Sequence, residues 1–132
     1  MKSLNSFLNP RRKPNHKFVL SDAFIDEKGN PIEWEMRQIA ASESSELQKQ
    51  ITDSSYFNTM TAYAAESLVY PNMHDAELLK GLSEKTGRKI LKAPDALVAM
   101  LTDSELAAVI EQYVKYNKLT EGISEKVDEA KN

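Results

Sequence analysis

The chain has 132 residues, of which 41% are hydrophobic and 28% are charged, an ordinary balance for a single globular domain. It contains no cysteine, so disulfide bridges and thiolate metal sites are excluded, and no apolar run approaches the ~20 residues that cross a bilayer. The first residues, MKSLNSFLNPRRK, lack a continuous apolar segment, so we expect no signal peptide and a cytoplasmic location.

The formal net charge of −3 conceals an asymmetry between the N-terminus and the rest of the chain. The first 17 residues hold five basic side chains and no acidic one, which leaves 12 of the 17 basic residues against all 20 acidic ones elsewhere. A basic arm on an acidic body can bind nucleic acid or an acidic protein surface, or it can rest on its own body. Nucleic-acid binding is not expected, because five charges without interleaved aromatic residues form a weak nucleic-acid site.

We predict that residues 1–16 form an irregular basic arm, because Pro10 and Pro14 restrict the residues before them to extended backbone. Leu4, Phe7 and Leu8 have the i, i+3, i+4 spacing of a short helix that docks into a groove. An arm tucked against its own domain explains the same pattern. The candidate protein-binding residues here are the apolar Leu4, Phe7 and Leu8 and the basic Arg11, Arg12 and Lys13.

The stretch Lys17–Ile39 predicts a β-hairpin. Ile32, Trp34 and Met36 alternate with charged residues, and the turn signal that precedes them contains Gly29, the residue best able to take a positive φ. Pro31 should open the second strand, since it has no N–H for a ladder bond. A two-stranded hairpin is marginal in water, so helices must cover the face that carries Trp34.

Helical signals occupy the rest of the chain. Ser42 is a candidate N-cap for a first helix that places Leu47 and Ile51 inside, and a second helix is predicted near Asn58–Val69. A third begins at Asp75, an N-cap candidate, and fades by Gly81–Gly87, and Arg88–Lys92 is a candidate for a further turn.

The last two helices have the clearest boundaries. Pro94 suits the first position of a short helix, and Thr102-Asp103-Ser104-Glu105 is a capping box. The following helix, to about Asn117, has a continuous apolar face formed by Leu106, Val109, Ile110, Tyr113 and Val114.

The predicted class is therefore α+β, with an N-terminal β-hairpin packed on a mostly α-helical body of four to six short helices and with flexible arms at both ends. We assign residues 1–16 to the basic arm and 17–119 to a single domain, in which the hairpin is 17–39 and the helical body is 42–117. Residues 120–132 form an acidic tail.

The sequence supports no catalytic, cofactor or metal site, and an enzyme is not expected. His16 and His74 have no partner at a metal-ligand spacing, the serines lie in no GxSxG context, and Gly81 and Gly87 form no phosphate-binding loop. Tyr113 and Tyr116 are candidates for an aromatic protein-binding edge, although core packing is the more common use of such residues.

Two segments, FLNPRRKPNHKFVLSDAFIDEKGNPIEWEMRQI and ESLVYPNMHDAELL, give the chain its family likeness. With these motifs the chain resembles the XkdN-like family of phage tail assembly chaperones over roughly residues 6–117. The resemblance implies a small cytoplasmic protein of a phage or prophage that binds the tape measure protein, helps recruit tail tube subunits and is absent from the mature virion. It brings no catalytic residues and no membrane association.

Three further possibilities stay open. A regulatory or nucleic-acid-binding protein would use the basic arm, a structural tail component would remain in the particle, and the protein could form a homo-oligomer. Related chaperones are often made in two lengths by frameshifting, and Ala130-Lys131-Asn132 is compatible with a slippery A-AAA-AAC codon run. We therefore hypothesise a longer form joined through the acidic tail.

Overall fold

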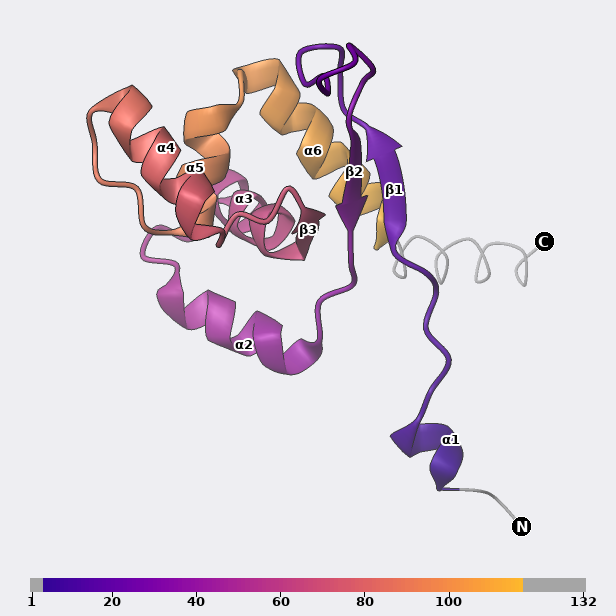
Figure 1. Cartoon of the computed structure of the whole chain (residues 1–132). Helices are drawn as coiled ribbons and strands as arrows, with labels where there is room; N and C mark the ends of the chain where they lie inside the picture. The colour runs from indigo at the N-terminus through magenta and orange to yellow at the C-terminus, as the bar shows by residue number, and fades with distance from the viewer. Residues whose placement is uncertain (1–3, 118–132) are drawn as a thin grey trace, which may run out of the picture.

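The computed structural model describes residues 4–117 (Figure 1). The predicted acidic tail and the codon-run residues Ala130–Asn132 lie outside this range. Within it, three short strands, β1 (His16–Val19), β2 (Glu33–Met36) and β3 (Leu68–Tyr70), form one antiparallel sheet in the order β1-β2-β3. The predicted hairpin is thus confirmed as the first pair, and it gains a third strand that the sequence did not indicate.

The hairpin turn has the conformation that its residues predict. Gly29 takes a φ of +85°, and the Asp26 carboxylate accepts the backbone N–H groups of Lys28 at 2.8 Å and Asn30 at 2.9 Å. Phe18 pairs with Trp34 across the two strands, and both side chains are buried on the inner face. The alternation along the strand therefore sorts side chains between core and solvent as expected.

Six helices accompany the sheet in the described range, which confirms the α+β class. The N-terminal arm contains the single-turn helix α1. The body consists of five longer helices. The bounds are α1 Asn5–Leu8, α2 Ala41–Gln50, α3 Tyr56–Ser67, α4 Ala76–Thr86, α5 Ala93–Met100 and α6 Asp103–Tyr116. None of these helices has the length and apolarity needed to cross a membrane.

Two predicted caps are confirmed and one is wrong. The Asp75 side chain accepts the N–H of Leu78 at 3.0 Å, and Thr102 and Glu105 form the reciprocal capping box of α6. Ser42 is not an N-cap, because α2 begins at Ala41. At this end the carboxylate of Glu43 reaches back to the N–H of Ala40 at 3.0 Å and supplies the missing acceptor.

The structure refines three predicted boundaries. Helix α3 ends at Ser67 instead of Val69, because Leu68 pairs with Met36 and the chain there becomes strand β3. Helix α4 does not fade at Gly81 but continues to Thr86, and Gly87 then ends it in the left-handed conformation at φ +71°. The turn predicted at Arg88–Lys92 is a non-helical connection that buries Ile90.

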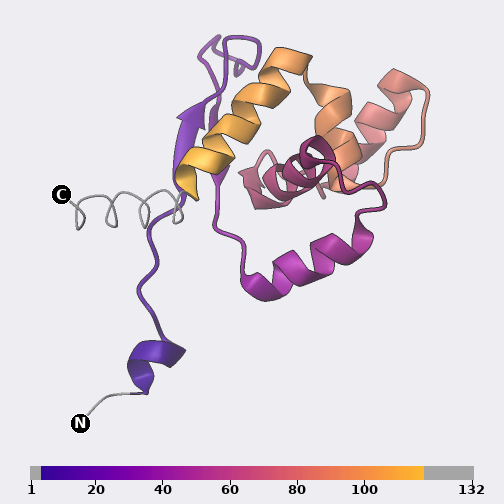
Figure 2. The ribbon, with the colours of Figure 1, turned by 180° about the vertical axis from the view of Figure 1, so that it is seen from behind.

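The helices cover one face of the sheet. Helix α3 lies at the centre of the body, and α6 runs alongside β1 in both views (Figures 1 and 2). The largest fully buried apolar side chains come from β2, the loop after β3, α5 and α6: Trp34, Met36, Met73, Leu97 and Val109. Val114, which the sequence places on the apolar face of α6, is 42% exposed, whereas Leu106 and Val109 on that face are buried.

Candidate functional site

The N-terminal arm projects from the body and carries an exposed apolar turn. Helix α1 stands clear of the rest of the molecule in two opposite views (Figures 1 and 2). Leu4, Phe7 and Leu8 are between 76% and 79% exposed. The turn is closed locally, since the side-chain amide of Asn9 donates to Asn5 at 2.7 Å. The predicted short helix is therefore present, and in this structure it is not tucked against its own domain.

The root of the arm is held by the end of α6. Lys13 donates from Nζ to the backbone carbonyl of Tyr116 and lies 4.3 Å from the centroid of the Tyr116 ring. The Tyr116 hydroxyl in turn donates to the backbone carbonyl of Pro14 at 2.8 Å. A cation at the C-terminus of a helix is favoured by the helix dipole. Lys13 is thus committed to an intramolecular contact, whereas Arg11 and Arg12 remain exposed.

A histidine strengthens this attachment. His16 Nε2 lies 2.7 Å from Gln112 Oε1, and its ring stacks on Phe18 and Tyr116 with centroids 5.4 Å apart in each case. Asn15 donates to the carboxylate of Glu35 at 2.9 Å. We call residues 13–16 the arm anchor. Beyond it, residues 4–12 project with three apolar and two basic side chains.

The two tyrosines predicted as an aromatic edge lie elsewhere. Tyr116 is buried beneath the arm anchor, and burial raises the pKa of its hydroxyl. Tyr113 packs against the core with its ring 6.2 Å from that of Tyr63, and burial and then the charge of Tyr63 raise its pKa. The structure therefore does not bring Tyr113 and Tyr116 onto the surface that carries Leu4, Phe7 and Leu8.

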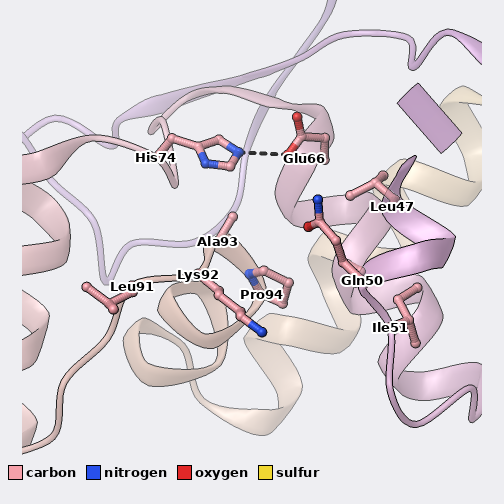
Figure 3. Close-up of a pocket in the computed structure, with 10 residues that line it drawn as sticks. Leu47, Gln50, Ile51, Glu66, His74, Leu91, Lys92, Ala93 and Pro94 are labelled. Carbon is pink, nitrogen blue, oxygen red and sulfur yellow. Dashed lines mark hydrogen bonds and ion pairs between the residues drawn. The ribbon is translucent and has the colours of Figure 1, made fainter. Parts of the chain in front are cut away.

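A pocket of about 240 Å³ lies between α2, α3 and the start of α5 (Figure 3). Glu66 and His74 in its lining belong to an ion-pair network that extends beyond the pocket to Arg37 and Glu43. Glu66 accepts from His74 at 2.7 Å and lies 3.6 Å from Arg37, which makes a two-pronged pair with Glu43 at 2.7 and 2.9 Å. The hydrogen bonds from Arg37 and from the Ala40 N–H lower the pKa of Glu43 to about 2.

This network links elements of the fold. Arg37 follows β2, Glu43 lies in α2 and Glu66 in α3, so the charges join the β2–α2 connection to the later helix α3. In the part of the chain that the structure describes, no cluster of three histidine or carboxylate residues could hold a metal ion.

A second, more apolar groove was not predicted. It has a volume of about 290 Å³ and lies between the hairpin, β3 and the start of α4. We call it the Trp34 groove, and its lining residues are Phe24, Ile32, Trp34, Tyr70, Pro71, Asn72, Asp75, Leu78 and Met100. Asp75 is the one charged residue in this lining. Four separate segments build it, so no local sequence signal could have revealed it.

Comparisons with known proteins give a family and a fold. Residues 4–131 match the family model described as phage XkdN-like tail assembly chaperone protein. The crystal structure of the protein YqbN superposes with a TM-score of 0.68 at 20% sequence identity, covering 90% of this chain and 98% of that one. At this identity the likeness shows a shared fold. No curated protein matches the chain.

Proposed function

Because the chain belongs to the XkdN-like family of phage tail assembly chaperones, we propose that it binds the tape measure protein of its phage or prophage and helps to recruit tail tube subunits. We propose further that it acts in the host cytoplasm and leaves before the tail is complete. Family membership favours a role without catalysis, in which the protein contributes binding surfaces only.

The observation that carries this proposal is the projecting apolar turn. A chaperone that shields aggregation-prone segments needs apolar surface that is open before its client arrives, and Leu4, Phe7 and Leu8 provide it. The flanking Arg11 and Arg12 add positive charge that steers acidic segments of a client and sets the orientation of binding. The anchor at residues 13–16 fixes the root of the arm on the body.

Co-expression with the tape measure protein tests the proposal. The wild-type chain is expected to increase the soluble tape measure protein and to be recovered in a complex with it. Phe7→Asp should weaken that complex by at least about tenfold, the loss expected for a central apolar anchor. Tyr56→Asp is the matched control, since Tyr56 is an aromatic residue with 75% exposure on the body.

Two outcomes would count against the proposal. A tape measure protein that stays equally insoluble with and without the chain, with no complex recovered, would refute the chaperone role. A complex that survives Phe7→Asp unchanged would keep the role and move the binding surface elsewhere. Detection of the chain in purified particles would refute transient action and favour a structural component of the tail.

Nucleic-acid binding by the basic arm is the competing function. It predicts a complex with DNA or RNA that weakens steeply with salt and disappears in the double variant Arg11→Glu, Arg12→Glu. The arm offers fewer free charges than its sequence implies, because Lys13 is engaged by Tyr116. An unshifted nucleic acid at low salt would eliminate this alternative.

A further inference from the structure

The chain carries both an uncovered apolar helix turn and an open apolar groove. We propose that α1 of one copy docks in the Trp34 groove of a second copy, and that the reciprocal contact makes a two-fold symmetric dimer by exchange of the N-terminal arms. The docked turn is the same one that is proposed to bind the client, so the client and the second copy compete for it.

The size of the groove suits the side chains of the arm. Its volume of about 290 Å³ is roughly twice that of the ~150 Å³ apolar cavity that holds a benzene molecule. The groove therefore has room for the Phe7 ring and one neighbouring leucine. The Phe24 ring is the partly exposed aromatic wall, and it packs edge to face on the buried Trp34 with centroids 5.4 Å apart. An incoming ring can extend this arrangement.

The charges are complementary as well. Asp75 lies in the lining, and Glu77 follows it in the first turn of α4. On the arm, Arg11 and Arg12 follow Leu8 after only two intervening residues, so they reach the rim when α1 fills the groove. A cationic arm therefore meets an acidic rim, which orients the docked turn and speeds its association.

The position of the arm anchor favours exchange of the N-terminal arms between two copies. Residues 13–16 are fixed to α6, and the four residues 9–12 that link them to α1 can span at most about 14 Å when extended. Helix α1 points away from the body that carries its own groove (Figure 1). In a two-fold dimer each arm makes the same contact, and the second docking event is intramolecular, so two modest contacts reinforce each other.

Sedimentation equilibrium of the full chain over about a hundredfold range of concentration provides the first test. The wild type is expected to approach twice the 14.9 kDa mass of the chain. Phe7→Asp on the arm and Tyr70→Asp on the exposed wall of the groove should each weaken the dimer by at least about tenfold. Tyr56→Asp should dimerise like the wild type. Ile32→Thr is a milder second groove variant, for use if circular dichroism shows that Tyr70→Asp does not fold.

Mixing the variants distinguishes arm exchange from any other interface. Phe7→Asp retains an intact groove and Tyr70→Asp retains an intact arm, so an equimolar mixture can form one good contact per pair. We expect heterodimers in the mixture at concentrations where each variant alone is a monomer. A fluorescent label on one variant makes this association visible.

Several results would overturn the proposal. These are a monomeric wild type, a Phe7→Asp variant that dimerises normally, and a mixture of the two variants without heterodimers. A monomeric wild type that still solubilises the tape measure protein would refute arm exchange and leave the proposed chaperone function intact. Docking of the arm into the groove of its own chain would appear as that monomer.

Discussion

Replacing Trp34 with alanine should destabilise the protein by about 3 kcal/mol, near the lower end of the 3–5 kcal/mol usual for removing a buried aromatic side chain. Trp34 is 1% exposed and its ring lies 6.1 Å from that of Phe18 and 5.4 Å from that of Phe24. The lower end applies because Trp34 lines an open groove, so water and neighbouring side chains can enter part of the space that it leaves.

The measurement is urea unfolding followed by far-UV circular dichroism. Fluorescence is unsuitable, because Trp34 is the sole tryptophan of the chain and the variant loses the signal. A loss of 3 kcal/mol is a large fraction of the 5–15 kcal/mol that stabilises a typical domain, so the midpoint should fall clearly while the slope stays the same.

Two controls bracket this result. Trp34→Phe keeps a ring between Phe18 and Phe24 and should cost less than Trp34→Ala. Tyr56→Ala removes an exposed aromatic side chain and should change stability by no more than about 0.5 kcal/mol. A cost below about 1 kcal/mol for Trp34→Ala, in a variant that still folds, would refute the assignment of the hairpin as the wall of the core.

Three further predictions concern single contacts. Tyr116→Phe removes the hydrogen bond to the Pro14 carbonyl and should lower the stability measured by thermal unfolding by about 0.5–1.5 kcal/mol. Amide hydrogen exchange in residues 13–16 should become faster. Unchanged exchange would refute the arm anchor. The folded-state pKa of Glu43 lies near 2, below its ordinary 4.5, so the unfolded chain binds more protons and stability falls as the pH drops from about 4.5 to about 2. Because the Arg37–Glu43 pair is partly exposed, its contribution to the free energy of unfolding is about 1 kcal/mol. In urea unfolding, Glu43→Gln should lose less stability than the wild type over that pH interval. An equal loss in the two proteins would contradict the role given to Glu43. Gly87→Ala should destabilise the protein by about 1–2 kcal/mol, because the φ of Gly87 is +71°. Gly81→Ala inside α4 should instead stabilise it by about 0.5–1 kcal/mol. Equal urea midpoints for the two variants would contradict the left-handed end of α4.

The sequence correctly predicted those elements that are stabilised by residues close to one another in the chain. The Gly29 turn and the capping box at Thr102–Glu105 appear where the sequence places them, because each depends on residues within a few positions of one another. The same holds for most of the inner face of α6, which its 3.6-residue period determines. The family likeness was recognised from the arm and hairpin segment and from ESLVYPNMHDAELL, and it is confirmed by the match over residues 4–131.

Strand β3 shows where local reasoning fails. Leu68 and Val69 continue an apparently helical pattern, yet Leu68 pairs with Met36 and Tyr70 with Glu35, so the backbone leaves α3 and joins the sheet. The partner strand lies more than 30 positions earlier in the sequence. Pairing energy from a distant strand overrides the weak preference of three residues.

For the candidate binding surfaces, the sequence alone determined which residues are chemically suited to bind: the apolar set Leu4, Phe7 and Leu8 and the basic residues after it. Only the tertiary structure decided which of them are available. Lys13 is held by Tyr116, 103 positions away, and the Trp34 groove is assembled from four segments. The exposure of a side chain and the shape of a groove depend on contacts between distant parts of the chain. The chemistry of a single side chain does not determine those contacts.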